Sequence, residues 1–258
     1  MTIDRTSLRL AATMLLGGQI LYVAITLLHT GGNANDHPAI FAAYAASTTW
    51  ITVHVAQFAS MATMLAGLLA LSFAIDAPGP ARWTARFGAA LAVTTLALYA
   101  VVLAVDGVAL KHAVTAWTSA PQAEKAARFA TAEAIRWLEW GTRSYQNLTL
   151  GLAVLLLAAS VARADRIPRP IPVLMGLSGL TYLVQGWVAG NDGFSQTHVT
   201  AIVLAEALNA VWMTWLVVVG WRMPHRVEGR DPRAVRPGAP EVARPSREHR
   251  NRDRDGAP

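Results

Sequence analysis

Six long apolar runs limit what this chain can fold into. Each is close to the ~20 residues that a helix needs to cross ~30 Å of hydrocarbon. The runs occupy roughly residues 9–29, 52–75, 86–107, 142–162, 171–190 and 201–221. We therefore predict an all-α fold, a six-span transmembrane helix bundle over residues 1–222. The first run should remain as an anchor, because it lacks the short apolar core and cleavage site of a signal peptide.

Composition separates this bundle from a charged C-terminal segment. The chain is 53% hydrophobic and 15% charged, whereas soluble domains carry about 25% charged residues. Residues 222–258 alone hold ten of the 22 Lys and Arg residues and six of the 16 acids. We predict that residues 223–258 form a disordered, Arg-rich cytoplasmic tail. Most of the formal charge of +6 belongs to this tail, so we expect the lipid bilayer as a partner and no nucleic acid.

Several classes of chemistry are excluded by what the sequence lacks. It contains no cysteine, so disulfides, thiolate metal sites and cysteine nucleophiles are ruled out. It also contains no phosphate-binding glycine loop, no HExxH zinc motif and no G-x-S-x-G elbow. A soluble-type enzyme domain is thereby excluded, while membrane-embedded catalysis stays open.

The basic residues are divided unequally between the two sides of the predicted bundle. Seventeen of the 22 fall on one side, and the opposite loops 30–51 and 191–200 contain none. By the positive-inside rule, this bias places both termini in the cytoplasm. Arg outnumbers Lys twenty to two, which we take as the mark of a GC-rich bacterial genome. We therefore predict a multi-pass protein of the bacterial inner (plasma) membrane.

The connections also differ between the two sides. Segments 76–83 and 163–172 are short and contain prolines, which predicts tight cytoplasmic turns. The outer connections are longer and should be partly helical. We expect Asp36 to cap a helix that begins at Pro38, and Pro121 to open a helix that runs into the fourth span.

Polar residues of separate spans fall at a common depth. Twenty residues of helix, counted from the cytoplasmic arginine or turn of each span, measure the hydrocarbon. These counts end on or beside His29, His54 with Gln57, Asp106, Arg143 and Ile202. Because a charge in lipid costs at least ~2.5 kcal/mol, we expect these polar side chains to face one another at the outer edge of the hydrocarbon.

The fourth span begins with a ladder of charge. Residues 148–162 are fifteen apolar positions, only about 22 Å of helix, so the span must recruit Arg143, Gln146 and Asn147. At about 100° per residue, these side chains share one arc of the helix with Glu139, and that arc should face protein or water. Glu139 precedes Arg143 by four residues, the favourable order for an ion pair. The charges before Arg143 should lie in the headgroup and water zone.

These positions define the candidate site, a polar pocket in the outer leaflet. Histidine and carboxylate together suit zinc or iron, so we consider His54, Asp106 and His112 as ligands of a divalent metal. An intramembrane carboxylate is a functional candidate by default, which adds Glu206. The pocket candidates are His54, Gln57, Asp106, His112, Glu139, Arg143, Gln146, Asn147, Glu206 and Asn209.

Four stretches of the chain carry a resemblance to a known group. They read NDHPAIFAAYAAS followed by VHVAQF, then VDGVALKHAV, EAIRWLEWG and YLVQGWVAGNDGF. In these stretches the chain resembles uncharacterised bacterial multi-pass membrane proteins, common in actinobacteria, whose domain has no known function. The resemblance covers roughly residues 8–222 and implies a six-helix membrane domain. It implies no activity, so the site residues stand on the depth pattern.

Three functions remain open for such a protein. The first is a pocket that binds a metal, a lipid or a small molecule, with metal-assisted hydrolysis or lipid modification as its chemistry. The second is a non-enzymatic scaffold or sensor in which the ion pairs only orient helices; a haem held by two histidines is a variant. The third is a small-molecule transporter. The sequence disfavours transport, because the inner halves of the second, third and fourth spans are almost purely apolar.

Overall fold

The computed structural model describes residues 2–76 and 79–223, so the predicted tail beyond Met223 lies outside the described residues. Two two-residue strands, β1 (Thr2–Ile3) and β2 (Ile75–Asp76), pair antiparallel. The helices are α1 (Arg5–Thr26), α2 (His37–Ala46), α3 (Trp50–Ala74), α4 (Pro80–Leu103), the π-helix η1 (Ala104–Leu110), α5 (Lys111–Ser119), α6 (Lys125–Val161), α7 (Pro170–Asp192) and α8 (Gln196–Arg222).

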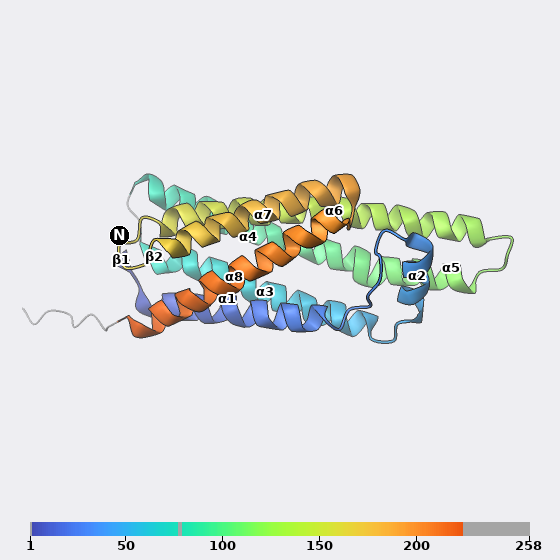
Figure 1. Ribbon diagram of the computed structural model, residues 1–258, viewed down its shortest axis with the longest axis horizontal. Coiled ribbons are helices and arrows are strands. Elements are labelled where there is room, and N and C mark those ends of the chain that lie inside the picture. The colour runs from blue at the N-terminus through green and yellow to red at the C-terminus, as the bar shows by residue number, and fades with distance from the viewer. Residues whose placement is uncertain (1, 77–78, 224–258) are drawn as a thin grey trace, which may run out of the picture. The chain divides into compact units, whose positions relative to one another are not determined.

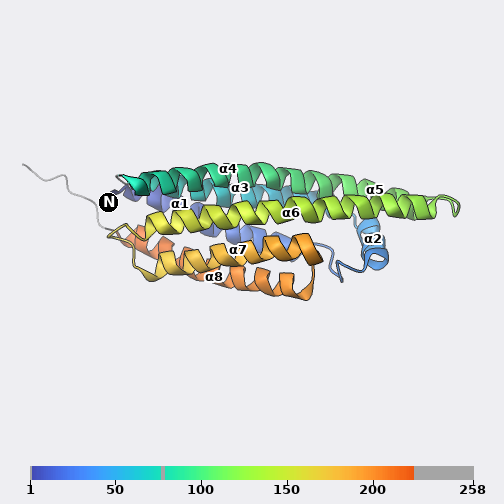
Figure 2. The same ribbon diagram turned by 90° about the horizontal axis from the view of Figure 1, so that it is seen from above.

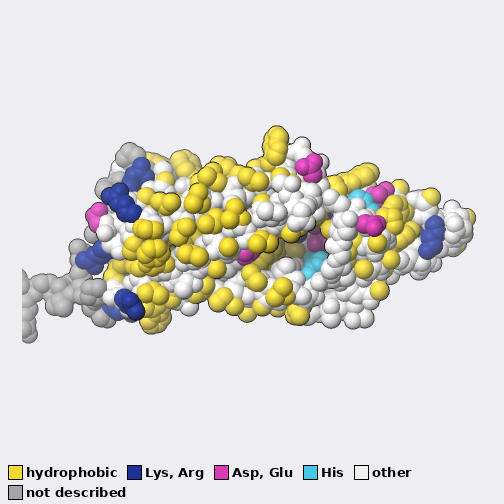
Figure 3. Space-filling model, in the orientation of Figure 1, with side chains coloured by type: hydrophobic (Ala, Val, Ile, Leu, Met, Phe, Trp, Pro, Cys, Tyr) yellow, Lys and Arg dark blue, Asp and Glu magenta, His cyan; other side chains and the backbone are white. Residues whose placement is uncertain are grey.

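The predicted six-span, all-α architecture is confirmed. Six helical segments are long and apolar enough to cross a membrane. Five of them are α1, α3, α6, α7 and α8. The sixth is the continuous segment formed by α4, η1 and α5. They lie side by side along one axis (Figures 1 and 2). β1 and the last residue of α8 lie at the same end of the bundle, where Lys and Arg side chains gather (Figures 1 and 3). We call this end, which includes Arg5, Arg9 and Arg222, the basic end.

An apolar core fills the half of the bundle next to the basic end. Five helices meet there through fully buried side chains such as Leu15, Leu68, Leu157, Met175 and Leu216. Large apolar side chains also cover the outside of the bundle (Figure 3), as lipid requires. Within lipid, close packing of such side chains holds helices together. The buried ionisable groups lie mainly in the other half, whereas this half holds a few buried hydroxyl and amide side chains such as Ser160, Ser178 and Asn209.

A small cap covers the end opposite the basic end, and it consists of α2, α5 and the first half of α6 (Figure 1). Its own core joins Phe41 and Tyr44 of α2 to Trp50, Leu110 and Val114. This core explains why the third span continues as helix past its predicted end at residue 107, and why the helix of the fourth span begins well before its predicted start at residue 142. A helix of 37 residues, the length of α6, measures about 55 Å and exceeds the hydrocarbon thickness.

Of the two helix starts predicted for the cap, one is confirmed and the other is displaced by a few residues. Asp36 does cap α2, accepting a hydrogen bond from the backbone N–H of Ala39, with Pro38 in the first turn. The helix expected to open at Pro121 begins four residues later, at Lys125. It does run into the fourth span without interruption, as predicted. Lys111 ties the cap together, because its Nζ donates to three carbonyl oxygens at the C-terminal end of α2.

The first and last spans touch at the basic end and separate toward the cap. The guanidinium of Arg9 donates hydrogen bonds to the carbonyl oxygens of Gly220 and Trp221, at 3.0 and 2.9 Å. From this contact α8 crosses the bundle obliquely, away from α1 and toward the end of α7 (Figure 1). In the space-filling view the surface is hollowed between the two diverging helices (Figure 3).

Candidate functional site

A large cavity lies beneath the cap, where α1 and α8 have separated. Its volume is about 780 Å³, and its wall combines α1, α3, η1, α6, α8 and the segment between α1 and α2. In Figure 3 the surface is hollowed there, and acidic and histidine side chains are visible inside. We call this cavity the pocket. Its polar lining includes Thr26, His29, Tyr44, Gln57, Asp106, Arg136, Glu139, Arg143 and His198.

Asp106 lies at the centre of the polar lining because the helix that carries it is locally widened. Residues 104–110 form η1, a π-helical insertion between α4 and α5. Such insertions are rare and often mark functional sites. The indole Nε1 of Trp50 donates to the backbone carbonyl oxygen of Asp106 at 3.3 Å. Asp106 is 5% exposed, and its Oδ1 has no hydrogen-bond partner among the described residues.

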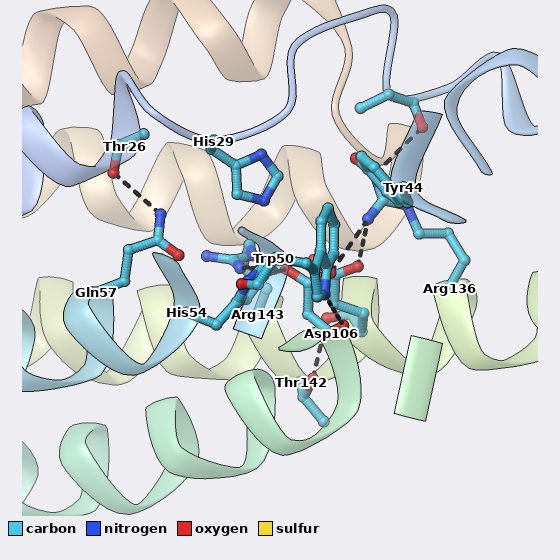
Figure 4. Close-up of polar contacts among 12 residues, drawn as sticks. Thr26, His29, Tyr44, Trp50, His54, Gln57, Asp106, Arg136, Thr142 and Arg143 are labelled. Atoms are coloured by element: carbon cyan, nitrogen blue, oxygen red, sulfur yellow. Dashed lines mark hydrogen bonds and ion pairs between the residues drawn. The ribbon is translucent and has the colours of Figure 1, made fainter. Parts of the chain in front are cut away.

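His54 on α3 is held between two oxygen atoms. Its Nδ1 lies 2.7 Å from the carbonyl oxygen of Trp50, and its Nε2 lies 3.1 Å from Oδ2 of Asp106 (Figure 4). A neutral imidazole carries a single N–H and can donate to only one acceptor. When Nδ1 carries that proton, it donates to the carbonyl oxygen of Trp50, the closer of the two acceptors. The Nε2 lone pair of a neutral His54 then faces the carboxylate, an arrangement that a cation between them would satisfy.

His29 completes this group from the segment that follows α1. Its Nδ1 lies 3.1 Å from the carbonyl oxygen of Thr30, and its ring packs against those of Trp50 and His54 (Figure 4). Burial lowers the pKa of His29. The neighbouring His54 and Arg143 lower this pKa as well, whereas the carboxylate of Asp106 raises it. The neutral, metal-binding form is thereby favoured. One ligand atom each from His29, His54 and Asp106 lie within 4.8 Å of one another.

Arg136 and Glu139 of α6 form a buried ion pair beside Asp106. Arg136 Nη1 donates to Glu139 Oε2, and the two side chains are 2% and 1% exposed. Arg136 Nη1 also lies 4.0 Å from Asp106 Oδ1, and its Nη2 donates to the Tyr44 hydroxyl at 3.4 Å. Burial raises the pKa of Tyr44 to about 12, so this hydroxyl keeps its proton and can also donate to a ligand.

Arg143, two turns further along α6, makes only long contacts to neighbouring carboxylates. Its Nη2 lies 3.5 Å from Glu139 Oε1 and 3.8 Å from Asp106 Oδ2, distances beyond a good hydrogen bond. Its Nε is buried and has no partner within the described part of the chain. The guanidinium stands 5.6 Å from the ring centroid of Phe194. Arg143 therefore has hydrogen-bond donors available to a ligand in the pocket.

A second, smaller cavity continues from the pocket toward the basic end. Its volume is about 70 Å³, and Arg143 borders both spaces. Besides Arg143, three of the predicted residues line it, namely Gln146, Asn147 and Glu206. Gln146 Nε2 and Glu206 Oε2 are buried without a partner among the residues described. These three predicted residues therefore line the small second cavity and not the pocket itself.

The structure brings together most of the residues predicted for the site, with two exceptions. His112 is exposed on α5, since six residues along a helix turn a side chain well away from Asp106; His29 takes the place expected for it. Asn209 lies outside the pocket, where it donates to the Tyr182 hydroxyl at 2.7 Å and accepts from Trp212 Nε1 at 3.0 Å. It joins α7 to α8 inside the apolar core.

Most of the residues that line the pocket were not among the predicted candidates, and besides His29 four of them lie close to the charged groups: Tyr44, Arg136, Phe194 and His198. Arg136 belongs to the charge ladder but was expected in the headgroup and water zone. It is buried because Tyr44 of the cap and Phe194 of the α7–α8 turn cover it, with ring centroids 5.6 and 4.6 Å from its guanidinium carbon. Only His198 carried a usable signal, since it maps to the outer end of the sixth span.

Comparisons with known proteins identify a domain and no activity. A family profile described as "Domain of unknown function (DUF4386)" matches residues 8–220. No curated protein and no solved structure matches the chain.

Proposed function

The chain belongs to the DUF4386 family, whose function is unknown, and from that premise we propose that it is a metal-binding membrane protein. Its site would hold a divalent transition metal through His29, His54 and Asp106. The observation that carries the proposal is the orientation of the two imidazoles. In each, Nδ1 faces a backbone carbonyl oxygen, an arrangement that typically fixes the ring of a metal ligand and leaves Nε2 as the ligand atom; Nε2 of His54 points at Asp106, the third candidate ligand.

The donor set defines the class of metal. Two imidazoles and one carboxylate suit zinc or iron(II). Ligands at ~2.05 Å from a tetrahedral metal are about 3.3 Å apart, so the present spacing, at most 4.8 Å, requires a small inward shift. His29 can supply it, because residue 29 lies in the non-helical segment between α1 and α2.

In a tetrahedral site, three protein ligands leave one coordination position, and two of the three candidate ligands, His29 and Asp106, line the pocket. Catalytic metal sites keep such a position for water or substrate, whereas structural sites fill all four. Metal-bound water is a nucleophile near neutral pH. Within this chain, Arg136 and Arg143 stand where they can bind a negatively charged group beside the metal. Metal-assisted hydrolysis of a bound ligand is the chemistry that these parts support best.

Elemental analysis of the purified protein tests the metal site. We expect the wild-type chain, loaded with Zn²⁺ or Fe²⁺ in mild detergent, to retain about one ion per molecule. His54→Ala and His29→Ala should reduce this to background, because two ligands rarely hold a metal. His112→Ala is the matched control, since His112 is exposed, and it should retain the ion. Wild type without metal, or both pocket variants with full occupancy, would refute the proposal.

We further propose that the pocket opens on the outer side of the membrane, with both termini in the cytoplasm. The support is the position of the pocket opposite the basic end (Figure 3), together with the positive-inside rule. The absence of cysteine from the chain allows a direct measurement.

Labelling of single cysteines measures this orientation. His112→Cys in the cap and Arg166→Cys at the basic end are both at exposed positions. In intact cells, a membrane-impermeant maleimide should label the first variant, and it should label the second only after permeabilisation. The reverse pattern would place the pocket on the cytoplasmic side.

A further inference from the structure

The opening between α1 and α8 leads into the pocket from the side of the bundle. On its two sides, Tyr22 and Thr26 of α1 and Val199 and Ile202 of α8 line the pocket. We call this opening the lateral mouth. Thr26 and Val199 are themselves exposed. A ligand could therefore reach the pocket without passing through the cap.

The lateral mouth lies at the depth where lipid headgroups meet acyl chains. Ile202 is twenty residues from Arg222 at the basic end, which corresponds to about 30 Å of helix. That distance equals the thickness of the hydrocarbon. Apolar side chains beside the mouth point outward, including Leu27 at 80% and Val203 at 62% exposure. The mouth is thus bordered by a surface suited to lipid.

The inside of the pocket favours a negatively charged group. Arg136 and Arg143 balance Asp106 and Glu139, so a bound dication would leave the site with net positive charge. Arg143 lacks a close hydrogen-bond partner within the described residues, and the Nε of the almost fully buried Arg136 also lacks one. Buried donors of this kind are expensive unless a ligand or water satisfies them.

We propose that the ligand of the pocket is an amphiphile of the bilayer with a phosphate headgroup, which enters through the lateral mouth. The phosphate binds Arg143 and the metal, and this metal contact rests on the function proposed above. The acyl chains stay between α1 and α8, against Tyr22 and Ile202. The volume of about 780 Å³ is within the range of pockets that enclose ligands of a few hundred daltons, which suits a headgroup and the first part of its chains.

Thermal unfolding in a neutral detergent tests this inference with three soluble probes. Dihexanoyl phosphatidic acid should raise the unfolding midpoint by several degrees in a concentration-dependent manner. Dihexanoyl phosphatidylcholine, whose headgroup carries no net charge, should raise it less. Inorganic phosphate should act only at far higher concentrations, because it lacks the chains that contact the lateral mouth.

Two neighbouring substitutions on α8 distinguish ligand entry through the lateral mouth from lipid binding to the outer surface of the helix. Ile202→Trp narrows the mouth and should weaken the phosphatidic acid effect at least tenfold in concentration while leaving the phosphate effect unchanged. Val203→Trp is the matched control, because Val203 is 62% exposed and does not line the pocket, and it should behave as wild type. If Ile202→Trp lowers the unfolding midpoint without ligand, Val199→Trp on the same edge replaces it.

The outcomes distinguish the ligand from the metal. Equal responses to the two lipids, or to phosphate and phosphatidic acid, would overturn the lipid inference. So would an unaltered lipid response in a folded mouth variant. Metal content is measured on the same samples. Protein that binds metal but ignores phosphatidic acid refutes only the lipid inference, whereas protein that responds to phosphatidic acid without binding metal refutes only the metal function.

Discussion

Arg136→Leu is expected to destabilise the protein by about 3–5 kcal/mol, the usual cost of breaking a buried ion pair by removing one partner. Arg136 is 2% exposed and binds Glu139, which is 1% exposed. Without the guanidinium, two carboxylates, those of Glu139 and Asp106, would share one side of the pocket with only Arg143 between them. Marginal stabilities of 5–15 kcal/mol make such a loss a large fraction of the total. Thermal or denaturant unfolding in detergent measures it.

Two further variants show whether buried charge is the cause. Arg128→Leu removes a second arginine from α6, but its pair with Glu124 is about half exposed, so the change should be below ~1 kcal/mol. Adding Glu139→Gln to Arg136→Leu should recover part of the stability, because it removes the unpaired negative charge. Equal effects of the two arginine variants would show that the buried pair contributes little.

Gly107→Ala is expected to lower metal affinity by about 10- to 100-fold, the range found when groups that orient a metal ligand are changed. A Cβ at position 107 of η1 would come within 2.9–3.1 Å of Cβ, Cγ and Cδ2 of His54. The imidazole must then move away from Asp106. Overpacking should also cost about 1–3 kcal/mol, reduced by the ~1 kcal/mol that alanine gains over glycine in a helix. Calorimetric titration with Zn²⁺ measures the affinity.

Gly141→Ala is the matched control for that substitution. Gly141 also lies in a helix near the site, but a Cβ there would meet nothing within 4 Å. This variant should keep its zinc affinity and become slightly more stable. Unchanged affinity in Gly107→Ala would indicate that the position of the His54 ring does not govern binding.

The spans and the meeting of polar residues could be predicted because both follow from length and depth. A bilayer fixes how many residues a crossing needs, so counting from the cytoplasmic arginine or turn of each span placed His54, Asp106 and Arg143 at one level. The cost of charge in lipid then required them to face inward. The same reasoning explains why the polar arc of α6 is buried at Gln146 and Asn147 while Tyr145, on the opposite arc, is 67% exposed.

The choice of the third metal-ligand candidate could not be predicted, because it depends on structure outside the spans. His29 and His112 both map to the outer end of a span. Only the path of the segment after α1 brings His29 over His54, and only the position of α5 in the cap turns His112 outward. Likewise, no periodicity in the sequence reveals the π-helical turn at Asp106. The burial of Arg136 depends on Tyr44 and Phe194, which are distant in sequence.

The contact of Arg9 with Gly220 and Trp221 fixes α1 and α8 to each other at one end, so a small change in the angle between them is amplified along their length. The helices are joined at one end, and Ile202 lies about 30 Å from that joint. A tilt of only ~5° about the joint would change the width of the lateral mouth by roughly 2.6 Å, given the rise of a helix. A change of angle that is negligible at Arg9 could therefore decide whether an acyl chain passes through the lateral mouth. Loss of Arg9 should for this reason affect a part of the protein far from its own hydrogen bonds.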